Sequence, residues 1–120
     1  MVFLNISQTM TNTFINYEVE NELNNARTAR ANGNEGKARV CARRAAGLAL
    51  RNYFKKQDLP EEGLSAYQLL KAFLNLSGIP PKAKQNAINL TLRVTESFNL
   101  PDHVDLITEA RSLCEQLVKM

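Results

Sequence analysis

The sequence predicts an all-α fold, a single compact bundle of about five helices in which two long antiparallel helices precede three shorter ones. Apolar residues recur every three or four positions in five segments, which is the spacing of one helix face. Clusters of Gly, Pro and Asn separate these segments. Apolar residues make up 44% of the chain and charged residues 22%, the balance of a folded protein. We therefore expect residues 1–120 to form one domain, with 1–8 as a flexible N-terminal segment.

The two long helices are expected at about Thr9–Ala31 and Lys37–Gln57, on either side of a turn at 32–36 that contains two Gly and two Asn. Small residues dominate one face of the second helix, so a neighbouring backbone can approach it closely, and Gly47 suits the same contact. We expect this helix to be central. The residues predicted to face the core are Ile15, Val19, Leu23, Ala26, Ala29, Ala38, Cys41, Ala42, Ala45, Leu48, Ala49 and Tyr53.

Three shorter helices are expected in the second half of the chain. A capping-box pattern that starts at Ser65 predicts a helix at about Ala66–Leu76. Pro81 suits the first turn of a helix that runs to about Thr95, and Asp102 is the expected N-cap of a last helix that reaches the C-terminus. The apolar contacts predicted for the last two helices are Ala87, Ile88, Leu90, Leu92, Val94, Val104, Ile107, Ala110, Leu113, Cys114 and Leu117.

Several functional classes are excluded by composition. No apolar run approaches the roughly 20 residues needed to cross a bilayer, so we expect a cytoplasmic protein without a membrane partner. Cys41 and Cys114 lack metal-ligand spacing and His103 is the only histidine, so no zinc site of the common type can form. We expect two buried thiols, with a disulfide as the minor alternative, and neither a metal nor a cofactor.

Basic charge is concentrated in one segment. Residues 27–56 contain nine Lys or Arg residues against one acidic residue, a net charge of +8, whereas the whole chain has +3. On the second helix, four of the basic residues fall on one stripe: Lys37, Arg44, Arg51 and Lys55. The stripe predicts either a surface that binds the phosphates of nucleic acid or a nucleotide, or solvated charge beside the core. Arg39 and Arg43 lie on another side and suit a subunit contact or a groove.

The order of elements resembles a known family. Residues 36–53, GKARVCARRAAGLALRNY, are similar to the alanine-rich second helix of HEPN domains. Residues 64–70 resemble the short third helix of those domains, and 87–94 with 105–113 resemble the helices that close their bundle. The resemblance spans about 10–118. It implies a bundle that often dimerises and is commonly associated with nucleotidyltransferase partners or RNA.

The nuclease branches of that family carry Arg, four to six residues, then His, and this motif is not matched. His103 follows Arg93 with nine residues between them, so no catalytic residue is transferred. We therefore expect a non-enzymatic, HEPN-like interaction domain, homodimeric, whose basic first hairpin binds a partner protein or phosphates. The alternative is an RNA-processing or nucleotide-handling enzyme of a toxin-antitoxin type. That enzyme would use Arg39, Arg43, His103 and Arg111.

Overall fold

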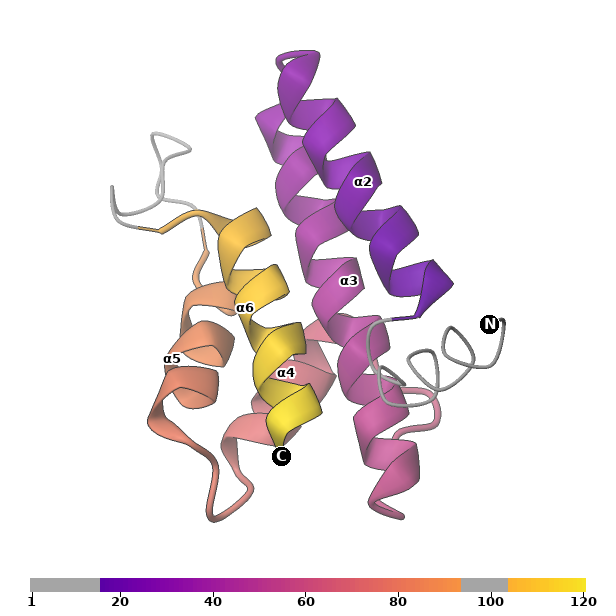
Figure 1. The fold of residues 1–120 in the computed structure, drawn as a ribbon, viewed down its shortest axis with the longest axis vertical. Coiled ribbons are helices and arrows are strands. Elements are labelled where there is room, and N and C mark those ends of the chain that lie inside the picture. The colour runs from indigo at the N-terminus through magenta and orange to yellow at the C-terminus, as the bar shows by residue number, and fades with distance from the viewer. Residues whose placement is uncertain (1–15, 94–103) are drawn as a thin grey trace, which may run out of the picture.

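The computed structural model describes residues 16–93 and 104–120, which form five α-helices (Figure 1). The long helices α2 and α3 form an antiparallel hairpin, and three shorter helices follow, as the sequence predicts. The predicted flexible segment 1–8 lies outside the described residues. The helices are α2 (Tyr17–Ala31), α3 (Glu35–Lys56), α4 (Ala66–Leu74), α5 (Pro81–Leu90) and α6 (Leu106–Lys119).

The hairpin is capped by asparagines. Asn16 is extended and its side chain accepts a hydrogen bond from the amide of Val19, so α2 begins at Tyr17. The prediction of one continuous helix from Thr9 is therefore wrong, because Asn16 is not helical. Gly33 has a φ of 79°, which a residue without Cβ adopts freely, and the turn it makes leads directly into α3.

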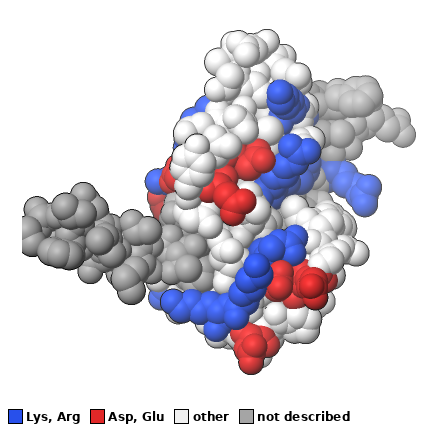
Figure 2. Space-filling model, turned by 90° about the vertical axis from the view of Figure 1, so that its right-hand side faces the viewer, with Lys and Arg blue, Asp and Glu red and all other residues white. Residues whose placement is uncertain are grey.

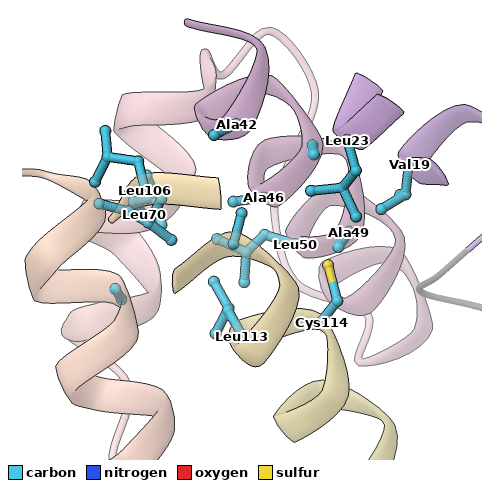
Figure 3. Packing of buried hydrophobic residues seen from close by; sticks show 14 of the residues in the cluster. Val19, Leu23, Ala42, Ala46, Ala49, Leu50, Leu70, Leu106, Leu113 and Cys114 are labelled. Carbon is cyan, nitrogen blue, oxygen red and sulfur yellow. The ribbon is translucent and has the colours of Figure 1, made fainter. Parts of the chain in front are cut away.

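Helix α3 is central, as predicted, because it packs against α2, α4 and α6. Ala42, Ala45, Ala46 and Ala49 are fully buried along it, and so is Leu50. Figure 3 shows Ala46 and Ala49 between apolar side chains of neighbouring helices. Small side chains let several helices approach one axis, so the bundle gathers around α3.

Gly47 marks the closest contact of α3. A Cβ built at this position would lie 2.6 Å from the Cβ of Ala66 and 2.9 Å from its Cα. Ala66 is the first residue of α4, and the predicted capping box between Ser65 and Gln68 holds this helix end in place. The glycine therefore fixes how closely the start of α4 approaches α3.

Helix α5 is shorter than predicted, and Ala87 and Leu90 of its predicted face are buried, whereas Ile88 is not. It ends at Leu90, and Thr91 is its C-cap, so the expected end near Thr95 is wrong. The β-branched Ile88 is 37% exposed, contrary to prediction, while Asn86 is buried. Asn86 donates to Glu109 at 2.8 Å and accepts from Ser112 at 3.1 Å, which joins α5 to α6 through polar contacts.

The last helix begins later than expected. Asp105, not Asp102, is the N-cap of α6, because its carboxylate accepts hydrogen bonds from the amides of Ile107 and Thr108. Asp102 itself lies outside the described residues. The predicted buried face is confirmed: Ile107, Ala110, Leu113, Cys114 and Leu117. None of the five helices is long and apolar enough to cross a membrane.

Replacement of Gly47 by Ala tests the close contact of α3 with α4. We expect Gly47→Ala to destabilise the protein by about 1–3 kcal/mol, since the new methyl group overlaps the backbone of Ala66. Gly36→Ala is the matched control: its Cβ would lie 3.9 Å from Asn34 Oδ1, so helix propensity should stabilise it by up to about 1 kcal/mol. Urea unfolding measures both. Equal effects of the two substitutions would contradict this packing.

Candidate functional site

The predicted basic stripe does not leave all four of its side chains available for a ligand. Arg51 donates hydrogen bonds to the backbone carbonyls of Glu61, at 2.8 Å, and Leu64, and pairs with the Glu61 carboxylate at 3.2 Å. It therefore holds the loop between α3 and α4. The other members of the stripe are exposed: Lys37, Arg44 and Lys55.

Acidic groups match some of the basic charge of the hairpin. Figure 2 shows the side of the molecule that lies to the right in Figure 1, with acidic side chains among the basic ones. Arg30, Arg39 and Arg51 each take part in an ion pair. The net charge of the segment thus overstates the positive charge that a ligand would meet.

Arg30 connects three helix ends. From the last turn of α2, its guanidinium forms two hydrogen bonds to Glu35 in the first turn of α3, at 2.8 and 3.0 Å. It also donates to Asp105, the N-cap of α6, at 3.0 Å. A second pair, Arg111 with Glu20, joins α6 to α2 further along. Charged contacts therefore supplement the small apolar contact between α2 and α6.

The Arg30 contacts lower the pKa values of both carboxyl groups. The hydrogen bond from Arg30 is the main reason that the pKa of Glu35 is lowered. Burial by itself raises the pKa of Asp105, but the hydrogen bond and charge of Arg30, with the amides of Thr108 and Ile107, outweigh it and lower that pKa. Both carboxylates stay ionised at neutral pH.

Arg43 reaches from α3 to the end of α5. Its Nε donates to the carbonyl of Leu90 at 2.9 Å, and an Nη donates to the carbonyl of Leu92. Leu90 is the last residue of α5 and Leu92 follows the helix, whose last turn has no basic residue of its own. Arg43 therefore satisfies backbone acceptors that the helix leaves without partners, and it brings a cation to the negative end of the helix dipole.

A hollow of about 460 Å³ opens beside this cap, and we name it the Arg43 pocket. Its walls come from α3, α4 and the segment after α5. The lining residues are Arg43, Tyr67, Thr91, Leu92 and Arg93. Its size falls in the range of small-molecule sites, roughly 300–1,000 Å³.

The Arg43 pocket is positively charged. Burial, followed by the charges of Arg39 and Arg93, lowers the pKa of Arg43, so three guanidinium groups act on one another here. The ring of Tyr67 is 38% exposed and has two cations near it: Lys71 Nζ at 5.8 Å and Arg93 Cζ at 5.5 Å from its centroid. None of the described residues that line the pocket is acidic. An anion that entered would reduce the repulsion among these groups.

Sequence reasoning placed Arg39 and Arg43 near a groove but missed the rest of this site. Tyr67 and Lys71 lie four positions apart on α4, so they share a face of the helix. Their contact could have been predicted from this spacing in the sequence. Arg93 lies three positions beyond the end of α5, and only the fold places it beside Tyr67. Three separate segments form the pocket, and periodicity within one helix cannot show that.

The residues of the alternative enzyme are not gathered at one place. Arg111 pairs with Glu20 and Glu115 and does not line the Arg43 pocket, while His103 lies outside the described residues. In residues 16–93 and 104–120, no three His, Cys, Asp or Glu side chains could hold a metal ion. Comparisons with protein-family models, curated proteins and solved structures found no match.

Both cysteines are free thiols in the core, as predicted. Burial raises the pKa of Cys114 to about 12. Burial also raises the pKa of Cys41, followed by the charge of Glu22. Neither thiol forms a thiolate readily at neutral pH, so neither is activated as a nucleophile.

The Arg30 contacts predict an acid-sensitive contribution to stability. Because the folded pKa values of Glu35 and Asp105 are lowered, their stabilisation is complete above the unfolded values near 4 and is lost as pH falls through the folded ones. These side chains are more than a third exposed, so we expect only about 0.2–1 kcal/mol per pair. Arg30→Gln should therefore flatten the pH dependence between about pH 5 and pH 3.

Urea unfolding at several pH values measures this effect, with Arg27→Gln as the control. Arg27 is exposed, and within the described part of the chain it donates to Asn24 and forms no ion pair, so its replacement removes one positive charge. The control should follow the wild-type pH profile. Parallel profiles for wild type and Arg30→Gln would show that the contacts of Arg30 do not contribute.

The cysteines predict a slow reaction with thiol reagents in the folded state. We expect Cys114, which is fully buried, to react more slowly than Cys41, which is 2% exposed and lines a surface hollow. Kinetics with a disulfide reagent at mildly alkaline pH, in wild type and in the Cys41→Ala and Cys114→Ala variants, assign the two rates. Rapid reaction of Cys114 in the native protein would contradict its burial.

Proposed function

We propose that this chain is a non-enzymatic, HEPN-like interaction domain that binds single-stranded RNA through the Arg43 pocket. One observation carries the proposal: exposed Tyr67, whose ring centroid lies 5.8 Å from Lys71 Nζ and 5.5 Å from Arg93 Cζ, lines the same pocket as the partly desolvated guanidinium of Arg43. The resemblance of about 10–118 to HEPN domains, which are commonly associated with RNA, supports the same class of ligand.

Phosphate groups suit the charges of the pocket. Arg43 and Arg93 line it, Arg39 acts on Arg43 electrostatically, and Lys71 lies near the ring of Tyr67. Arginine donors match phosphate oxygens in pairs, and the low polarity around Arg43 strengthens the attraction. Such binding weakens as salt rises, because phosphates release their counterions when the protein replaces them.

An unpaired base suits the aromatic ring. Tyr67 is exposed and lies within the same pocket as the arginines, so a base could stack on the ring while the adjacent phosphate contacts a guanidinium. Bases in a duplex are already stacked and cannot do this, which favours single strands over double-stranded RNA. The predicted homodimer and the nucleotidyltransferase partner stay predictions of the family resemblance.

Substitutions at exposed residues of the pocket test the proposal without loss of the α5 cap. We expect Tyr67→Leu to weaken binding of a fluorescent oligouridine by about 5- to 100-fold, because stacking contributes roughly 1–3 kcal/mol per base. Arg93→Gln should weaken binding and reduce its salt dependence, because one phosphate contact is lost. Fluorescence anisotropy at low and high salt measures both effects.

Lys55→Gln is the matched control, since it removes one positive charge from α3 at an exposed position outside the pocket. Its affinity should stay within about twofold of wild type if the pocket, and not the net charge, provides binding. An equal loss in Lys55→Gln and Arg93→Gln would instead support the predicted stripe. Absence of binding at low salt would sink the RNA proposal.

A further inference from the structure

A second site lies in the groove between α2 and α3 and shares no lining residue with the Arg43 pocket. It consists of two neighbouring hollows, of about 400 and 200 Å³, and both are lined by Glu22 and Arg44. We call the two hollows together the Glu22 groove. It carries an inference independent of the proposed RNA site.

Glu22 supplies a buried acceptor. One carboxylate oxygen, Oε1, is buried and has no hydrogen-bond partner within the described residues. The thiol of Cys41 lies beside this carboxylate: after the larger effect of burial, the charge of Glu22 and a side-chain hydrogen bond between the two groups raise the pKa of Cys41. A thiol is only a weak donor, so it does not replace a charged one. A buried carboxylate oxygen without a donor is costly, so a cationic or N–H donor that entered the groove would be strongly favoured.

Arg44 supplies the opposite charge at the same place. It is exposed, and it takes part in none of the ion pairs found among residues 16–93 and 104–120. Lys37 also lines the larger hollow. Both cations line the larger hollow together with Glu22 and Cys41, and both lower the pKa of Cys41, against the effect of burial. A guanidinium in this position matches a carboxylate.

The two hollows of the groove differ in polarity. The larger one has polar walls, with Asn25 and Thr28 among them. Gly47, Leu48 and Ala66 line the smaller one and present little but carbon, apart from Arg51, whose guanidinium is used in the α3–α4 loop. An apolar group of modest size fits there next to the charged pair.

We propose that the Glu22 groove binds a small zwitterion of the α-amino-acid type with an apolar side chain. Glu22 would accept from the ammonium group, Arg44 would donate to the carboxylate, and the side chain would enter the hollow lined by Leu48. A phosphate group fits less well, because Glu22 repels a doubly charged anion. The two proposed sites therefore select different chemistry.

Thermal unfolding of the full chain with L-leucine tests this inference. A ligand that binds only the folded state raises the Tm with concentration. We expect L-leucine to raise it, and leucinamide and N-acetyl-leucine, which lack the carboxylate and the ammonium charge respectively, to bind at least about tenfold more weakly. Glu22→Gln and Arg44→Gln should each weaken L-leucine binding by a similar factor, measured by calorimetry.

Lys55→Gln and Arg93→Gln are the controls and should keep the response to L-leucine, since neither residue lines the groove. If the protein does not bind RNA but responds to L-leucine, the zwitterion site is supported and the RNA site is not. If it binds RNA but does not respond to L-leucine, the RNA site is supported and the zwitterion site is not. No shift with L-leucine, or an equal shift with leucinamide or inorganic phosphate, would overturn the zwitterion site.

Discussion

The close approach of neighbouring helices to α3 is the constraint on which the rest of the structure depends. Five fully buried alanines and Gly47 leave room for α2, α4 and α6 around one axis. Larger side chains there would push these helices outward, because interiors are close-packed and adjust little. The start of α4 and the end of α5 then fall near α3, and arginines on α3 can reach their neighbours. Both proposed sites lie where that packing ends.

Several arginines of this bundle have a structural role: they hold helix ends and loops together. Arg30, Arg43 and Arg51 each reach from the α2–α3 hairpin to another element: the start of α6, the end of α5 and the loop before α4. Their targets are carboxylates and backbone carbonyls that helix ends and loops leave without partners. A guanidinium can donate to two acceptors at once. The arginine side chain carries its charge at the end of a long apolar stem, so the stem can cross a helix surface while the charge stays at the acceptors. The basic segment thus serves first to hold helix ends together.

Sequence patterns were sufficient for the fold because repeated apolar spacing and local caps both act over a few residues. The capping box of α4, the buried faces of α2 and α6, and the close contact at Gly47 all follow from such patterns. Two of the failed predictions, the starts of α2 and α6, concern which of several local caps is used, whereas others depend on contacts distant in sequence. Asn86 is buried because α6 offers it partners, which no pattern within α5 reveals. Likewise, charge spacing alone could not distinguish Arg51, which is used internally, from Arg44, which is exposed.

The double role of Arg43 decides what kind of site its pocket can be. The guanidinium cannot move towards a ligand without loss of its hydrogen bonds to Leu90 and Leu92, each of which contributes about 1.5–3 kcal/mol when one partner is charged. It therefore acts as a fixed positive charge in the wall of the pocket. A fixed charge needs no reorganisation when an anion arrives, so its attraction is realised fully in binding. Lys71 and Arg93 have no such backbone contacts among the described residues and can adapt to the ligand. Affinity then depends on the packing of α5 against its neighbours, because that packing determines where Arg43 is held.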